Sequence, residues 1–159
     1  IDWLSNNIPE SDETTIVHGD YRLGNLIYDL NEPKVIAVLD WELSTLGHPL
    51  ADLGYNLMLH EEDSDVRSGF SLKNLDLVKL GIPTKDYLVK KYCEMVNRDV
   101  VNPNYYIAFS MFRNVAILEG VLARGRAGNA SSSLAEEKGA LGKPIAKIAW
   151  DLVQHSKID

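Results

Sequence analysis

The sequence VHGDYRLGN, residues 17–25, lies between short runs of strand-forming residues. Runs rich in β-branched and aliphatic side chains predict three strands, over residues 14–17, 26–28 and 35–39. Turn formers at 29–34 join the last two strands into a hairpin. The sequence between the first two strands is therefore predicted to be a loop, with Asp20 and Asn25 five positions apart.

The second strand of the hairpin is followed by Asp40, which begins the sequence DWE. Pairing of the two strands brings Asn25 and Asp40 to the same end of the hairpin. Carboxylate and amide oxygens are ligands that Mg²⁺ prefers, and an amide adds no charge beside Asp20 and Asp40. Phosphoryl transfer needs such ligands, together with a carboxylate for the acceptor hydroxyl. Protein kinases place an Asp, an Asn five residues later and a second Asp in this order.

The motifs HGD, GN and DWE resemble the signature of the aminoglycoside phosphotransferase and choline kinase-like family. The segments VHGDYRLGNLIYD and VIAVLDWELSTLGHPLADLGY fit that family, and the agreement is dense over residues 15–58. The string HGDYRLGN, the pair Phe112 with Arg113 and the segment GRAGNASS at 125–132 more closely resemble the kinase-like domains related to or fused with acyl-CoA dehydrogenases. That resemblance implies phosphorylation of a hydroxyl group on a hydroxyacyl-CoA.

The resemblance also implies roles for the residues of the motifs. Asp20 is the expected catalytic base, and Asn25 and Asp40 are the expected magnesium ligands. His18 belongs to the expected catalytic site, where orienting the loop is favoured over proton transfer. ATP is the expected co-substrate and Mg²⁺ the expected cofactor.

Other positions near the motifs are expected to support the site. Asp52 matches the aspartate with which the family braces its catalytic loop through hydrogen bonds. Arg22 is expected either to bind a substrate phosphate or to pair with a neighbouring carboxylate. Glu42 is a secondary candidate, because a backbone group or an arginine is a more frequent partner than a metal. His48 stands where the family more usually has Asp, so no role is assigned to it.

From residue 46 onward the pattern is helical. A short helix over 1–8 precedes the strands, and later helices are predicted over 50–59, from a cap at Thr84 to 96, from 102 or 103 to about 125, and from 131–133 to about 153. Gly139, Gly142 and Pro144 are expected to kink or interrupt the last one. The expected fold is α+β, the mainly helical C-terminal lobe of a protein-kinase-like fold, with a hairpin unit at 1–45 and a helical acceptor side at 46–159.

The charge divides unevenly along the chain. Residues 1–65 carry 14 acids and two bases, whereas residues 66–159 carry nine acids and 14 bases. The acidic half argues against a general nucleic-acid binder, and the longest apolar run, 35–39, is too short to span a membrane. Cys93 stands alone and is expected to be a packed thiol. The basic half suits an anionic acceptor, for which Arg113 is the candidate contact.

A kinase-like enzyme also needs an N-terminal lobe with a phosphate-covering loop and a nucleotide-binding lysine. No glycine-rich G-x-G-x-x-G precedes His18, so that lobe is expected in another part of the same protein or in a partner chain. The isolated lobe is then expected to be inactive or weak, because positioning the phosphates is most of the catalysis. A cytoplasmic location is expected if the protein is bacterial.

Three other functions fit parts of the sequence. The acceptor could instead be an aminoglycoside or choline. A metallophosphoesterase would use ligand types found at His18, Asp20, Asn25, Asp40, His48 and His60, although no histidine directly follows Asn25. A non-catalytic scaffold lobe is the remaining alternative, against which the intact Asp20, Asn25 and Asp40 argue.

Overall fold

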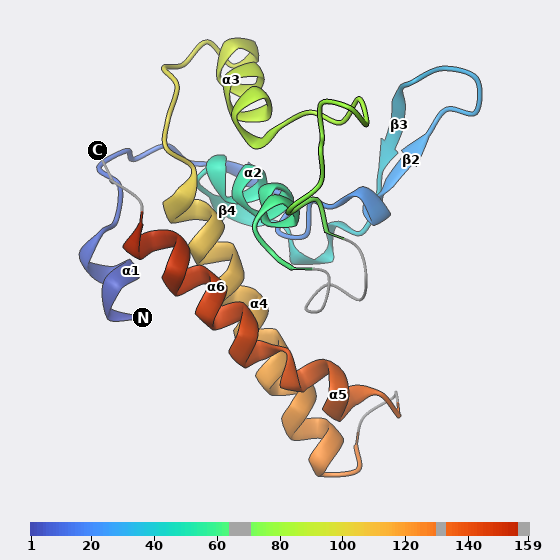
Figure 1. Ribbon diagram of the computed structural model, residues 1–159, viewed down its shortest axis with the longest axis vertical. Coiled ribbons are helices and arrows are strands. Elements are labelled where there is room, and N and C mark those ends of the chain that lie inside the picture. Colours follow the sequence, from blue (N-terminus) through green and yellow to red (C-terminus); the bar gives the residue numbers. More distant parts are fainter. Residues whose placement is uncertain (64–70, 130–132, 156–159) are drawn as a thin grey trace.

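The computed structural model describes residues 1–63, 71–129 and 133–155. Short strands occupy the first third of the chain, and helices form the rest (Figure 1). In chain order the elements are α1 (Asp2–Asn6), β1 (Thr15–Val17), η1 (Leu23–Asn25), β2 (Leu26–Tyr28), β3 (Val35–Val38), η2 (Trp41–Leu43), β4 (Thr45–Gly47), α2 (Leu50–Leu57), η3 (Met58–His60), α3 (Lys85–Met95), α4 (Asn104–Arg126), α5 (Ala135–Ala140) and α6 (Gly142–Gln154), where η denotes a 3₁₀ turn. The predicted α+β fold class is confirmed.

The strands form two small antiparallel sheets of two strands each in the described residues. β2 and β3 form the predicted hairpin, with Leu26 opposite Val38 and Ile27 opposite Ala37. In Figure 1 this hairpin projects from the body of the molecule. β1 pairs with β4, which the sequence analysis missed because a three-residue strand that ends at Gly47 carries too weak a strand signal. The strand pairing therefore extends to Gly47, two residues beyond the expected limit of the hairpin unit.

The predicted helices are present, with small differences at their ends. α2 continues beyond Leu57 only as the 3₁₀ turn η3. The predicted cap of α3 is confirmed, because the Thr84 hydroxyl accepts a hydrogen bond from the Tyr87 N–H (3.3 Å). The last helix is divided at Leu141 into α5 and α6, as its glycines and proline indicated. Its start was predicted at residues 131–133, of which 131 and 132 lie outside the described residues.

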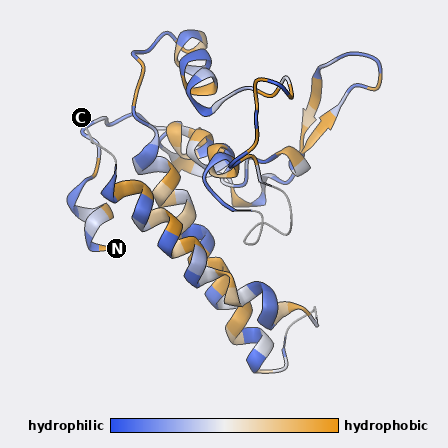
Figure 2. Cartoon of the chain, in the orientation of Figure 1, coloured by the Kyte–Doolittle hydropathy of each residue, from blue (hydrophilic) through white to orange (hydrophobic). Residues whose placement is uncertain are grey.

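The core lies where α2, α3, α4 and α6 meet. Its buried side chains are Leu57, Met58, Val89, Cys93, Ile107, Met111 and Ile145. Burial of each large apolar side chain contributes about 1.5–3 kcal/mol relative to leaving it in water. Cys93 is among them, so the predicted packed thiol is confirmed. In Figure 2 hydrophobic and hydrophilic residues alternate along these helices, which is typical of helices with one buried face.

α2 and α4 approach each other closely at Gly54. A Cβ atom at Gly54 would lie 2.5 Å from the backbone carbonyl carbon of Tyr106 on α4, so only glycine fits. By length and hydropathy α4 is also the one described helix that could cross a membrane. It packs against α2, α5 and α6, and Arg113 near its centre is half-buried.

Candidate active site

The hairpin brings Asn25 and Asp40 together, as predicted. The Leu39 N–H donates to the Asn25 carbonyl oxygen (2.8 Å), which extends the β2–β3 pairing by one step. Asn25 is buried, whereas Asp40 is exposed and has a left-handed backbone (φ 68°). That backbone conformation turns the chain out of β3 directly after the strand.

The carboxylate of Asp20 has partners on several sides. Its Oδ2 accepts hydrogen bonds from Arg22 Nε (3.0 Å) and Asn25 Nδ2 (2.8 Å). Burial alone would raise the pKa of Asp20, but hydrogen bonds from Tyr55, Arg22 and Asn25 and the positive charge of Arg22 outweigh burial. The pKa of Asp20 is therefore lowered, and the group is an ionised acceptor at neutral pH.

Tyr55 is a site residue that the sequence analysis missed. It lies on α2 three residues after Asp52 and hydrogen bonds with Asp20. Residues three apart share a face of a helix. Because Asp52 was expected to brace the catalytic loop, the same helix face could have been predicted to bring Tyr55 to the loop as well.

Asn25 and Asp40 offer oxygen atoms that suit a hard divalent cation. Asn25 Nδ2 donates to both the backbone oxygen (2.9 Å) and the carboxylate of Asp20. These two bonds set the orientation of the amide and leave its Oδ1 as an acceptor. The Asp40 carboxylate makes no hydrogen bond within the described residues, so its oxygens are also available. One amide oxygen and one carboxylate fit Mg²⁺, which keeps several waters and binds few protein ligands.

Asp52 holds the start of the loop from the first turn of α2. Its Oδ2 accepts from the His18 N–H (2.6 Å) and its Oδ1 from the Gly19 N–H (2.9 Å). This is the geometry that the expected bracing role requires. Gly19 itself has φ 82°, and a Cβ there would lie 2.5 Å from the Leu43 carbonyl oxygen, so only glycine is compatible with this turn.

His18 is buried, and both of its ring nitrogens meet backbone groups. Nδ1 accepts from the Asp20 N–H (3.2 Å), which assigns the proton to Nε2, and Nε2 then donates to the Leu39 carbonyl oxygen (2.8 Å). The ring therefore ties the Asp20 backbone to the residue before Asp40. This arrangement suits the orienting role and leaves neither nitrogen directed at a substrate.

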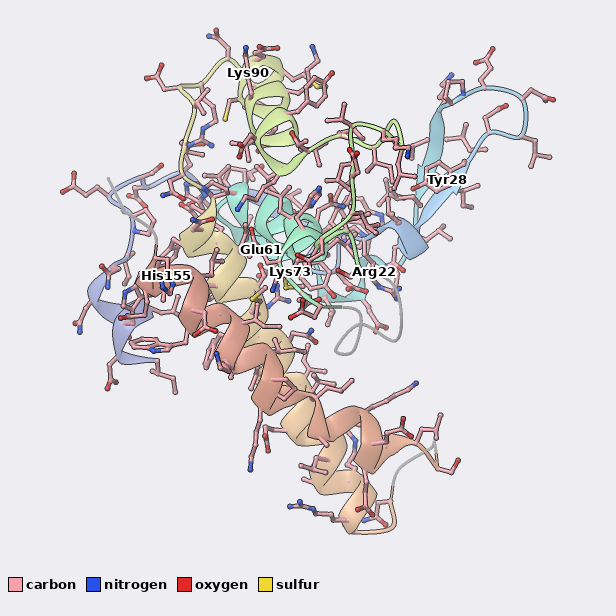
Figure 3. All side chains as sticks on the ribbon, viewed as in Figure 1. Arg22, Tyr28, Glu61, Lys73, Lys90 and His155 are labelled. Carbon is pink, nitrogen blue, oxygen red and sulfur yellow. The ribbon has the colours of Figure 1, made fainter. Side chains whose placement is uncertain are left out.

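Arg22 and Glu42 lie differently with respect to Asp20. Arg22 forms an ion pair with Asp20 (3.0 Å), one of its two expected roles. The hydrogen bond to Asp20 raises the pKa of the Arg22 guanidinium. Desolvation opposes this rise, and the charges of Asp20, Tyr55 and Asp40 add to it. Figure 3 shows Arg22 at the end of the hairpin nearest the body, and Tyr28 on its projecting part. Glu42 is exposed in η2 and makes no hydrogen bond within the described part of the chain.

Arg113 lies beside the loop. Its Nη2 donates to the Gly19 carbonyl oxygen (2.9 Å), and its side chain lines a pocket of about 380 Å³ together with aromatic residues of α4. The sequence analysis placed Arg113 on the acceptor side as an anion contact. Its observed partner is a backbone oxygen of the loop that carries Asp20.

The additional histidines that a metallophosphoesterase would need have other partners. His48 Nε2 lies 3.1 Å from the Ser11 hydroxyl, and His60 Nε2 lies 3.3 Å from the Pro83 carbonyl oxygen. Within residues 1–63, 71–129 and 133–155, no three His, Cys, Asp or Glu side chains gather as a metal site.

Comparison with known proteins agrees with this geometry. Residues 1–73 match the model of the phosphotransferase enzyme family. Acyl-CoA dehydrogenase family member 10 of Mus musculus is 44% identical over 152 residues, which cover 95% of this chain and 14% of that protein. Acyl-CoA dehydrogenase family member 11 of Gallus gallus is 37% identical over 158 residues, which cover 94% of this chain and 20% of that protein.

A solved structure extends the similarity to three dimensions. A protein of Ralstonia eutropha JMP134, described as a "putative aminoglycoside phosphotransferase", is 43% identical, with a TM-score of 0.87 over 98% of this chain and 48% of that chain. The chain thus spans about half of the solved relative and a fifth or less of the two dehydrogenase-named relatives. Residues 1–73, which contain Asp20, Asn25, Asp40 and Asp52, match the phosphotransferase enzyme family, and the chain has the kinase-like α+β fold.

Proposed function

We propose that this chain is the catalytic and acceptor-binding lobe of an ATP- and Mg²⁺-dependent small-molecule kinase. One observation carries the proposal. The Asp20 carboxylate is hydrogen bonded to the amide of Asn25, and the backbone oxygen of Asn25 accepts from the N–H of Leu39, the residue before Asp40. A proton acceptor and two oxygen ligands thus adjoin one another, as transfer of a γ-phosphate to a hydroxyl group requires.

In this proposal Asp20 accepts a hydrogen bond from the acceptor hydroxyl and takes its proton as the oxygen bonds to the γ-phosphorus. The bond from that phosphorus to the bridging oxygen of ADP breaks. A low pKa suits this role, because the transition state of phosphoryl transfer is loose and the proton leaves late. Asn25 Oδ1 and the Asp40 carboxylate would hold Mg²⁺, which supplies charge neutralisation on the nucleotide phosphates.

We propose a hydroxyacyl-CoA as the acceptor. Segments similar to this chain lie within longer proteins named as acyl-CoA dehydrogenase family members, which favours an acyl-CoA as the class of acceptor. The basic balance of residues 66–159 also suits an anionic acceptor better than a cationic aminoglycoside or choline. A nucleotide-binding lobe would be supplied by another part of the same protein or by a partner chain.

The test is an ADP-release assay on the whole protein, with Mg-ATP and a panel of hydroxyacyl-CoAs, aminoglycosides and choline. We expect turnover with a hydroxyacyl-CoA. Asp20→Asn should lower kcat by about 10³-fold or more, which combines loss of the base with loss of the charge that positions the hydroxyl. Thermal unfolding should change little, because one oxygen remains to accept from Arg22 and Asn25.

Other results would favour the other functions. Turnover only with aminoglycosides or choline would show that one of these, and not a hydroxyacyl-CoA, is the acceptor. Phosphate release from simple esters with Mn²⁺ and no nucleotide would support a metallophosphoesterase. Failure of the whole protein to bind Mg-ATP in calorimetry would support a non-catalytic lobe, and unchanged turnover in Asp20→Asn would remove Asp20 as the base.

A further inference from the structure

The peptide group that joins Gly19 to Asp20 is held at both of its polar ends. Its carbonyl oxygen, on Gly19, accepts a hydrogen bond from Arg113 Nη2 (2.9 Å). Its N–H, on Asp20, donates to His18 Nδ1 (3.2 Å). A peptide group is planar, so holding its oxygen and its nitrogen sets the direction in which the Asp20 Cα leaves the loop.

The other polar group of Gly19 is held as well. Its N–H donates to Asp52 Oδ1 (2.9 Å) on α2, while Arg113 reaches its carbonyl from α4. Side chains from two helices, α2 and α4, thus bind the backbone of Gly19. Such restraint matters at Gly19, because a glycine lacks the Cβ atom that limits the backbone dihedral angles of other residues.

Arg113 extends to the loop from a well-packed part of α4. α4 packs against both α2 and α6, and residues one turn before Arg113, such as Phe109, line the same pocket as Gly19. The neighbours Ser110 and Met111 are fully buried. The guanidinium therefore extends from a fixed backbone to the loop, over 94 positions of sequence.

We propose that Arg113 is a positioning residue that acts on Asp20 through the Gly19–Asp20 peptide group. It therefore does not serve as the contact for an anionic acceptor. The expected effect on turnover rests on the proposed kinase function. The hydrogen bond itself is independent of that function, and the two can be tested separately.

The variants are Arg113→Met, which keeps the length of the side chain without its donors, and Arg113→Lys, which keeps one cationic donor. Arg124→Met is the matched control, because Arg124 lies on the same helix but is exposed. In the whole protein, Arg113→Met should lower kcat about 10²-fold, since small misplacement of a catalytic group has an effect of this size. The KM values for ATP and acceptor should stay within about twofold, because substrate contacts are unchanged. Arg113→Lys should recover most of the loss, and Arg124→Met should behave as wild type.

A second measurement needs no turnover. Amide hydrogen exchange at Gly19 and Asp20 should be at least about tenfold faster in Arg113→Met, while exchange at Ile107 and Met111 in the core of α4 stays as in wild type. Two results would overturn the proposal: an acceptor KM raised tenfold with kcat unchanged, which identifies a substrate contact, or unchanged exchange at Gly19 and Asp20. If the wild-type protein transfers no phosphate to any acceptor, the kinase proposal fails, and the exchange data alone decide whether Arg113 holds the loop.

Discussion

His48 packs its ring against Tyr106 of α4, with the ring centroids 4.8 Å apart, and sits at the start of α2. Its Nδ1 accepts a hydrogen bond from the Leu50 N–H (3.2 Å), an acceptor role that a protonated ring would lose. Burial is the main cause that lowers the pKa of His48 below its ordinary 6.5. The charge of Arg98 acts in the same direction, and that of Glu13 opposes it. His48 is therefore a support for the helix that carries Asp52, in its neutral form.

This environment predicts a pH dependence of stability. The unfolded chain binds a proton at His48 near pH 6.5, while the folded chain binds it only at lower pH. Because the unfolded state takes up more protons in that window, the His48 contribution is complete above pH 6.5 and is lost as pH falls toward the folded pKa. Urea unfolding at pH 8 and pH 5.5 should show a smaller loss in His48→Asn than in wild type, since the Asn oxygen can still accept from Leu50 N–H. An equal loss in both proteins would contradict this assignment.

The catalytic carboxylate illustrates how neighbouring side chains outweigh burial. Asp20 is partly buried, which by itself would raise its pKa, yet three hydrogen-bonding side chains keep the ionised form favoured. Arg22 comes from the same loop, Asn25 from η1 and Tyr55 from α2. The site thus combines local sequence with one residue that only the packing of α2 brings to it.

At the level of elements, the site depends on how closely α2 lies against α4. α2 carries Asp52 and Tyr55, and α4 carries Arg113. These helices meet at Gly54, where any side chain would collide with the α4 backbone. Their contact therefore sets the distance between the side chains that hold Gly19 from its two sides.

Gly54→Ala should consequently destabilise the fold by about 1–3 kcal/mol, because α2 must move away from α4 to admit the methyl group. Gly120→Ala is the matched control. A Cβ there would lie 3.5 Å from the end of the Arg124 side chain, in ordinary contact. Since Gly120 is inside α4, alanine should stabilise that helix by about 0.5–1 kcal/mol. Chemical denaturation of both variants measures the difference, and equal stability of the two would contradict the close-packing argument.

At the level of the whole molecule, both strands of the β2–β3 hairpin contain hydrophobic residues (Figure 2), and several of these are exposed. The exposed fractions are 41% for Ile27, 46% for Tyr28, 41% for Val35 and 55% for Ile36. These residues belong to the hairpin that follows Asn25 and precedes Asp40 in the chain. An exposed hydrophobic surface is typical of a site that a ligand or another part of the protein covers.

We therefore expect the isolated chain to bind Mg-ADP at least about tenfold more weakly than the whole protein, a difference of about 1.4 kcal/mol. The chain supplies the oxygen ligands for the metal but few of the contacts to the phosphates. Titration calorimetry on both proteins measures the two dissociation constants, with EDTA as the control for metal dependence. Equal affinities would show that this lobe alone forms the nucleotide site.

The sequence by itself determined the α+β fold, the hairpin, the main helices and the joining of Asn25 to Asp40. Those features follow from local patterns, because strand pairing over one short turn and the periodicity of helices need no distant partner. Tyr55 beside Asp20, the pairing of β1 with β4, and the bond from Arg113 to Gly19 were decided only by the tertiary structure. Each joins segments whose contact depends on how closely the helices and strands pack, and a single sequence carries no direct signal of that packing.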